Sequence, residues 1–439
     1  MQRLLFLCIL LFDPINLLLN SKNPYDYSSY KSVSKDTESI DETIKSTNSD
    51  ESAVYITESG ILIQNPTIGK ESGDSSKIED SNLYGVNSAV FVQGGSLTVT
   101  EAKITSEANG AHALFSTNEG SASGSVSIIT KGSSSGGLIT TYDGVISIVS
   151  ATITTNGDSS PLTSTEEGGS ISCKDSTIST KGKNSDLAQS KGDGSGTIVF
   201  DNVNGSAEKS KIGNIDGKVS FIIQNQSKVK CSANPIKENI DPSGVMLYQS
   251  KSKFNNQNSF GCTESTLEIL DSSNYYSTAP MFFVTNTQAN IQLKNCQLIY
   301  GSNIFINIKA TNEWGIKGSN GADVSIQFDQ QDIEGDFLID AGSTLNLNLI
   351  KSNIKGKINP SNTVKSLIIR LDRYSTITIT GNSYCTTINN ELKDGSNLIN
   401  GSYTWTIGTP SNNDNNAEGI YKSNLIKIGI ILLINILLL

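Results

Sequence analysis

The sequence predicts an all-β fold, a single-chain parallel β-helix in which short strands stack coil upon coil along one axis. Apolar residues recur at fixed intervals, since the segment Ser-Ala-Val-Tyr-Ile at 52–56 returns 36 residues later as Ser-Ala-Val-Phe-Val at 88–92. No helical period intervenes, and a repeat of about 25 residues is too short for a β-α-β unit, which needs ~30 or more. The 439 residues are 36% hydrophobic and only 17% charged, which fits a thin core under a long, uncharged polar surface. At about 25 residues per coil, the segment 52–408 predicts about 14 coils.

The N-terminal segment has the features of a secretion signal followed by a leader. Arg3 precedes an apolar run over 4–19, and small or polar residues follow. A positive start, a short apolar stretch and a small-residue end are typical of a secretory signal peptide, which we expect at 1–20. Residues 21–51 have few apolar side chains and many Ser, Thr, Asp and Lys. We expect a flexible leader there.

In the first half of the chain, three short strands are expected in each coil. The first is marked by an apolar residue that returns after 24 or 25 positions, at Val90, Leu114, Leu138, Leu162, Leu187 and Ile212. The second alternates apolar and polar residues, as a strand with one buried face does, at 97–99, 145–148 and 171–173. The third is marked by an apolar residue every 25 or 26 positions, at Ile153, Ile178, Val203 and Val229. Gly, Asn, Asp and Ser between the strands predict tight turns.

The second half keeps the strands but loses the strict interval. Apolar or alternating segments lie at 245–248, 281–284, 304–306, 324–328, 337–339, 345–349, 367–369 and 377–379. Longer excursions at 251–262 and 311–323 predict loops that leave the coil. Binding residues often lie on such loops above a rigid scaffold.

The C-terminal segment predicts attachment to a membrane. Residues 425–439 are almost entirely Leu and Ile, a run shorter than the ~20 residues that span a bilayer. The polar linker 409–424 precedes this tail, in the order that directs a glycosylphosphatidylinositol (GPI) anchor to a small residue while the tail is removed. The expected attachment residues are Asn413, Asn415 and Asn416. A short membrane helix and a buried helix are the alternatives for the tail.

Composition argues against several partners and cofactors. With 33 Lys and Arg against 43 Asp and Glu, the net charge is −10, which disfavours nucleic acid as a partner. One His and no Cys-x-x-Cys make a zinc site improbable. An odd number of cysteines remains after the signal, so at least one thiol is unpaired or pairs between chains; these are Cys173, Cys231, Cys262, Cys296 and Cys385. Three Asn-x-Ser sequons predict N-glycosylation at Asn204, Asn225 and Asn400.

Several segments together carry a resemblance to a known group. They are Ser-Ala-Val-Phe-Val…Gly-Gly-Ser-Leu-Thr-Val at 88–99, Met-Leu-Tyr-Gln-Ser at 246–250, Phe-Val-Thr-Asn-Thr at 283–287, Trp-Gly…Gly-Ser-Asn-Gly at 314–321 and Leu-Asn-Leu at 345–347. In these segments the chain resembles secreted right-handed parallel β-helix repeat proteins of the pectin-lyase-like superfamily. Many relatives in that group are adhesin-like or carbohydrate-binding surface proteins. Because the fold hosts unrelated activities, the resemblance transfers no catalytic residue.

The residues suited to polysaccharide cleavage are scattered. The resemblance implies clustered carboxylates with an Arg or Lys in an enzyme of this fold, but no adjacent Asp pair, Gly-His-Gly turn or Arg-x-Lys occurs. His112 is expected to be structural, and Arg370 and Arg373 to be surface charges on opposite faces of a strand. The densest acidic segment contains Asp329, Asp332, Glu334 and Asp336, with Asp340 nearby. Plain solvation is the first expectation for these carboxylates, calcium binding the second and acid–base catalysis the third.

Aromatic residues in expected loops are the candidate ligand contacts. Tyr275, Tyr276 and Trp314 would offer rings on which sugars stack. We therefore expect a GPI-anchored protein on the extracellular face of the plasma membrane, a non-catalytic adhesin-like or glycan-binding module whose partners are extracellular glycans or surface proteins. A structural coat protein is one alternative, and a polysaccharide lyase or hydrolase of the same fold is the other. No cofactor is expected, and calcium is the one candidate ion.

Overall fold

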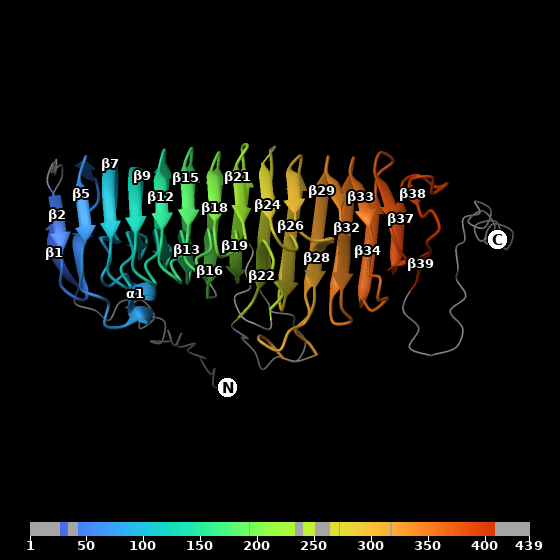
Figure 1. Ribbon diagram of the computed structural model, residues 1–439, viewed down its shortest axis with the longest axis horizontal. Coiled ribbons are helices and arrows are strands. Elements are labelled where there is room, and N and C mark those ends of the chain that lie inside the picture. Colours follow the sequence, from blue (N-terminus) through green and yellow to red (C-terminus); the bar gives the residue numbers. More distant parts are fainter. Residues whose placement is uncertain are drawn as a thin grey trace, which may run out of the picture.

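The computed structural model describes residues 27–33, 43–192, 194–232, 240–250, 264–271, 273–316 and 318–408. In these ranges the chain forms a parallel β-solenoid of about 14 turns. Figure 1 shows the strands standing side by side along the long axis, from β1 and β2 at one end to β38 and β39 at the other. Each strand pairs in parallel with its equivalent one coil further on. The predicted fold class and number of coils are confirmed.

The first face of the solenoid is a 12-stranded sheet. Its strands are β1 (Ser28–Val33), β3 (Glu51–Ile56), β6 (Val90–Gln93), β8 (Leu114–Thr117), β10 (Leu138–Thr141), β13 (Thr163–Glu166), β16 (Ala188–Lys191), β19 (Gly213–Asp216), β22 (Val245–Tyr248), β25 (Phe282–Thr285), β28 (Ile304–Ile308) and β31 (Asp336–Ile339). A bridge from Phe337 to Ile358 extends this face. It continues as the pair β36 (Ser383–Cys385) and β39 (Trp405–Ile407).

The second face contains the longer strands. They are β4 (Ile61–Gln64), the first parts of β7 (Ser96–Ser106) and β9 (Ser121–Thr130), β11 (Val145–Val149), β14 (Gly169–Lys174), β17 (Gly196–Asp201), β20 (Val219–Gln224), β23 (Glu264–Ile269), β26 (Gln288–Lys294), β29 (Asp323–Asp329), β32 (Thr344–Ile350), β34 (Ser366–Leu371) and β37 (Thr387–Asn390). In β32, as in its neighbours, every second residue is buried.

The third face falls into two blocks. The first block comprises β2 (Thr43–Ser46), β5 (Thr67–Lys70), the second parts of β7 and β9, β12 (Thr152–Thr155), β15 (Thr177–Thr180), β18 (Asn204–Ala207), β21 (Lys228–Cys231), β24 (Asn274–Ser277) and β27 (Gln297–Tyr300). The second block is a separate 4-stranded sheet of β30 (Asp332–Glu334), β33 (Asn353–Gly356), β35 (Thr376–Ile379) and β38 (Leu398–Ile399).

Inward side chains from all three faces form one continuous core from Val33 to Trp405. Because side chains alternate across a strand, one apolar residue in two is enough to fill this core. Serine side chains close the corner between the second and third faces. The Ala151 and Ser352 backbone N–H groups donate to Ser176 Oγ and Ser375 Oγ, each at 3.0 Å. These hydroxyls satisfy backbone donors where the strand ladders are interrupted.

The expected intervals are confirmed in some coils and wrong in others. The 36-residue offset is correct, since Val54 pairs with Val90 and Ile61 with Leu97. Along the first face, however, Leu138 pairs with Thr163 rather than with Leu162. Leu162 and Thr163 are both buried at this corner, so the apolar residue of the repeat can occupy either position. On the third face the partner of Ile178 is Gly205 rather than the expected Val203.

The first interval, of 36 residues, is longer than the others because its coil contains a helix, which the repeat did not indicate. The coil between β5 and β6 includes helix α1 (Ile78–Tyr84), which ends at Gly85 in the left-handed conformation (φ 77). Ser81 of α1 is fully buried, and its hydroxyl donates to the Gly110 carbonyl. The helix therefore covers the outer side of the first face.

Regular strands also lie in the segment 21–51, for which we expected a flexible leader. Residues 28–33 form β1 and pair with β3, and residues 43–46 form β2 and pair with β5. Val33 and Ile44 are buried in the core. The solenoid therefore begins before Ser52, because two apolar positions suffice for a strand when the next coil supplies the pairing. Residues 1–20, the linker 409–424 and the tail 425–439 lie outside the described residues.

Candidate functional site

The pairing of successive strands on the third face is interrupted between β27 and β30. Gln331, which is 3% exposed, bridges the two blocks through its side chain. The Cys296 N–H donates to Gln331 Oε1 (3.0 Å), and Gln331 Nε2 donates to the Cys296 carbonyl (2.8 Å). These two hydrogen bonds from the side-chain amide take the place of backbone-to-backbone pairing between the two blocks.

A groove of about 1160 Å³ lies at this break. Its walls come from β27 and the turn after it, and from β30, β33 and β35. The Tyr300 hydroxyl crosses it to donate to the Glu334 carbonyl. Burial raises the pKa of Tyr300 above its ordinary value, so the phenol stays protonated and able to donate. This hydrogen bond joins β27 to β30 across the groove, whose walls are strands and one turn.

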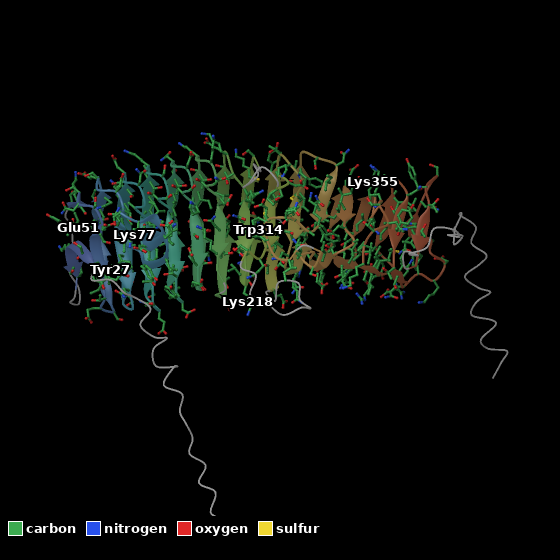
Figure 2. All side chains as sticks on the ribbon, turned by 90° about the horizontal axis from the view of Figure 1, so that it is seen from below. Tyr27, Glu51, Lys77, Lys218, Trp314 and Lys355 are labelled. Atoms are coloured by element: carbon green, nitrogen blue, oxygen red, sulfur yellow. The ribbon has the colours of Figure 1, made fainter. Side chains whose placement is uncertain are left out.

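Charges in the groove are paired from one strand to the next. Glu334 Oε1 lies 2.8 Å from Lys355 Nζ, and Asp336 Oδ2 lies 3.4 Å from Lys357 Nζ. Asp332 Oδ1 accepts a hydrogen bond from Asn353 Nδ2 (2.8 Å). Figure 2 shows Lys355 near the edge of the rod, in its C-terminal half. Lysines therefore compensate the charges of Glu334 and Asp336, whereas Asp332 keeps its negative charge beside a neutral amide.

The acidic segment does not converge on one point. Asp329 lies 3.8 Å from Lys294, on the second face, whereas Asp332, Glu334 and Asp336 point toward partners on β33 and beyond. In the part of the chain that the structure describes, no group of three or more His, Cys, Asp or Glu could hold a metal ion. Nothing in this arrangement favours a calcium site.

The two expected loop tyrosines lie instead in β24, and they point in opposite directions. Tyr275 is 1% exposed and packs in the core, where its hydroxyl donates to the Met281 carbonyl (3.5 Å). Tyr276 is 43% exposed on the outer side. It pairs with Ile299 of β27, which is 48% exposed and lines the groove. Tyr276 and Ile299 together form an apolar platform beside the groove.

Trp314 lies in the loop that joins β28 to β29, as expected. It lies on the first face, whereas the two tyrosines belong to the third. Its ring centroid is 4.4 Å from that of Tyr248, and it packs against the outer side of the first face beside Phe283. Figure 2 shows it near the middle of the rod. The structure therefore separates Trp314 from Tyr276.

His112 and the two arginines do not form a reactive group. His112 is buried, its Nδ1 accepts the Gly136 N–H (3.0 Å), and burial lowers its pKa to about 3. Arg370 points outward from β34. Arg373 lies beyond that strand and pairs with Glu391 (3.5 Å), so the two arginines do not share a strand as expected.

The sequons occupy different surroundings. Asn204 is exposed at the start of β18. Asn225 is exposed in a turn, where its Nδ2 donates to Asp201 Oδ1 (2.9 Å). Asn400 is half-buried after β38. Glycosylation at these residues stays a prediction, and the GPI residues Asn413, Asn415 and Asn416 lie outside the described residues.

In the part of the chain that the structure describes, Cys173, Cys296 and Cys385 have free thiols, and Cys231 is buried in the core. Burial raises the pKa of Cys173, Cys296 and Cys385 to about 12. A thiol with so high a pKa is a poor nucleophile. Cys262 lies outside the described residues.

Sequence reasoning missed the outward residues of the second face. The alternation Leu-Asn-Leu-Asn-Leu at 345–349 signalled a strand, and the same letters show that amides cover its outer side. Counting apolar positions alone discards this information.

No protein-family model, curated protein or solved structure matches the chain. In the part of the chain described here, no helix has both the length and the apolar character needed to cross a membrane.

Proposed function

We propose that the protein is a secreted, GPI-anchored cell-surface solenoid that binds extracellular glycans on its third face, without catalysis. The platform of Tyr276 and Ile299 beside the 1160 Å³ groove carries this proposal. A tyrosine exposed on a rigid strand offers a ring face and a hydroxyl at a low cost in conformational entropy. Both are suited to stacking on a sugar and bonding to its hydroxyl groups.

The lining of the groove favours a polyhydroxylated ligand. Ser302, Asn303 and Thr378 contribute hydroxyl and amide groups. Both ammonium groups of the lining are paired with carboxylates, and the remaining carboxylate accepts a hydrogen bond from an amide. A glycan can exchange hydrogen bonds with the polar groups without separating charges. These features fit a binding module better than an enzyme, because glycosidic cleavage requires two carboxylates free to face the scissile bond.

The cell-surface part of the proposal rests on the two ends of the sequence. The signal at 1–20 would direct export, and the polar linker with its apolar tail would direct lipid attachment. A rod on such an anchor would present its faces away from the membrane. An acidic chain of net charge −10 would also be repelled by anionic lipid headgroups.

The proposal is tested on intact cells. Phosphatidylinositol-specific phospholipase C should release the protein, and the released protein should bind a restricted set of glycans on an array, equally with and without calcium. Retention on cells that release a known GPI-anchored control would contradict the anchor. A folded protein that binds no glycan on the array would contradict the binding function and favour the coat-protein alternative, whereas turnover of a polysaccharide would favour the enzyme.

A further inference from the structure

The second face carries an ordered array of amide side chains in its C-terminal half. Strand register places Asn290 and Asn346 in one column, with Ser325 between them. Gln292, Gln327 and Asn348 form a second column beside it. All of these side chains project outward, because the residues between them belong to the core. We call these five amides the amide ladder.

Four amides of the ladder have no hydrogen-bond partner among the described residues: Gln292, Gln327, Asn346 and Asn348. Asn290 is different, since its Nδ2 donates to Glu264. Outward amides elsewhere on the solenoid often bond to a carboxylate on the neighbouring coil, as Asn202 does with Asp175 (2.7 Å) and Asn353 with Asp332 (2.8 Å). Glu264 and Glu268 lie on the coil before the ladder, and the hydrogen bond from Asn290 to Glu264 is the one such contact of the five amides among the described residues. The donors and acceptors of the other four therefore remain available.

The ladder also lies in a hollow. A depression of about 500 Å³ is lined by residues of β23, β26, β29, β32 and β34, including all five amides. Each ladder residue is half-buried rather than fully exposed. The walls therefore restrict the amides, and a ligand would need to order few rotamers on binding.

The spacing of the ladder suits a linear polymer of sugars. Neighbouring coils are ~4.8 Å apart, and alternate residues along a strand are ~6.6 Å apart. The first distance is close to the length of one pyranose residue. Each primary amide offers two N–H donors and one carbonyl acceptor, which complement sugar hydroxyl groups. A chain laid along the solenoid axis would meet two amides on β26, then Gln327 with the hydroxyl of Ser325 on β29, and then two amides on β32.

The charges around the ladder select against a polyanion. Glu268 lies at its N-terminal end and Arg370 at its C-terminal end, and the two columns between them are uncharged. One cation beside one anion in a chain of net charge −10 gives no electrostatic attraction for a uniformly acidic polymer.

We propose that the amide ladder is a second glycan site, specific for a linear, uncharged polysaccharide that lies along the solenoid axis. The inference rests on the proposed function for its ligand class, but it concerns a different face and different residues. Tyr276 belongs to the third face and takes no part in this site.

The test uses the full chain released from cells and fluorescently labelled hexasaccharides of linear β-1,4-glucan, β-1,4-mannan and α-1,4-glucan, with a polyuronate hexasaccharide for comparison. We expect one uncharged oligosaccharide to bind. The double variant Gln327→Ala and Asn348→Ala should weaken this binding at least about tenfold, because each lost amide removes hydrogen bonds made to the ligand. Gln224→Ala is the matched control, an outward amide of the same face outside the hollow, and should leave the affinity unchanged.

Two further measurements keep the outcome unambiguous. Gln327→Glu preserves the shape of the side chain and should weaken binding without unfolding the coil, which circular dichroism would verify. Affinity for the uncharged oligosaccharide should stay within about twofold between ~0.05 M and ~1 M salt, because no ion pair is formed. Strong salt dependence, or preference for the polyuronate, would overturn the ligand class.

The failure of this inference differs from failure of the proposed function. Glycan binding that is lost in Tyr276→Ala but kept in the Gln327→Ala, Asn348→Ala variant would overturn the amide-ladder site and leave the proposed function standing. Loss in the double variant alone would support the ladder and contradict the platform at Tyr276. A folded protein that binds none of the glycans would overturn both.

Discussion

At the scale of the residue, the neighbours Tyr275 and Tyr276 illustrate how one position decides between core and surface. The segment Asn-Tyr-Tyr-Ser does not reveal which ring points inward, because both are aromatic. The register decides it, since Tyr275 pairs with the buried Val229. The repeat marks Val229 as an inward residue, but the interval from Val229 to Tyr275 is far longer than the intervals of the preceding coils, which hides the alignment.

The two tyrosines should therefore respond oppositely to truncation. Tyr275→Ala removes a fully buried ring and should lower the free energy of unfolding by about 3–5 kcal/mol. Tyr276→Ala should change stability by less than about 0.5 kcal/mol and reduce glycan binding on the third face. Urea denaturation and array binding, measured on both variants, check this pair. Equal effects on stability would contradict the assigned orientations.

His112 gives the fold a dependence on pH. Burial, with a smaller contribution from Lys191, lowers its pKa from 6.5 to about 3. The unfolded chain therefore binds a proton between these pH values that the folded chain does not, and stability present above pH 6.5 is lost as the pH falls toward 3. We expect His112→Gln to show a flatter fall in the free energy of unfolding over this range. Parallel slopes for the two proteins would contradict the buried, neutral His112.

At the scale of the element, the corners of the solenoid depend on close backbone contact. A Cβ on Gly132, Gly157 or Gly182 would lie 1.8–1.9 Å from a carbonyl oxygen one coil below. The sequence indicates turns at these glycines, but only stacking shows that they form a column. Such contacts exclude every other residue at these positions without requiring a left-handed backbone.

Gly157→Ala should therefore be destabilising, by about 1–3 kcal/mol, because the coils must separate to admit the methyl group. Gly69→Ala is the control, since the nearest atom to its Cβ is the movable Thr105 Oγ1 at 3.3 Å. Thermal melting followed by circular dichroism compares the two. A melting temperature of Gly157→Ala equal to that of the control would contradict the stacking of these turns.

The acidic strands β29 and β30 lead to a prediction about metal removal. Because their carboxylates have cationic or amide neighbours on adjacent strands, we expect chelation with EDTA to leave the melting temperature and glycan binding unchanged. Calorimetry of the chelated protein during calcium titration checks this. A saturable calcium signal that is lost in Asp332→Asn would contradict it.

At the scale of the whole molecule, the repeat predicted the solenoid because every coil must bury the same inward positions. It could not predict the break between β27 and β30 or the groove there, because both depend on which strands fail to meet. The sequence did not reveal helix α1 either, because its seven residues are too few to show a helical pattern. The repeat constrains the residue types at inward positions only. The candidate binding surfaces consist of outward residues, so the repeat does not predict them.

The most direct test of the central claim is a crystal structure of the released protein bound to the oligosaccharide that the array selects. We predict a sugar ring stacked on Tyr276 with its neighbours in the groove between β27 and β30, or, for a linear uncharged chain, hydrogen bonds to the amide ladder. A sugar bound only at Trp314 or at the ends of the rod would contradict this account of how the solenoid recognises glycans.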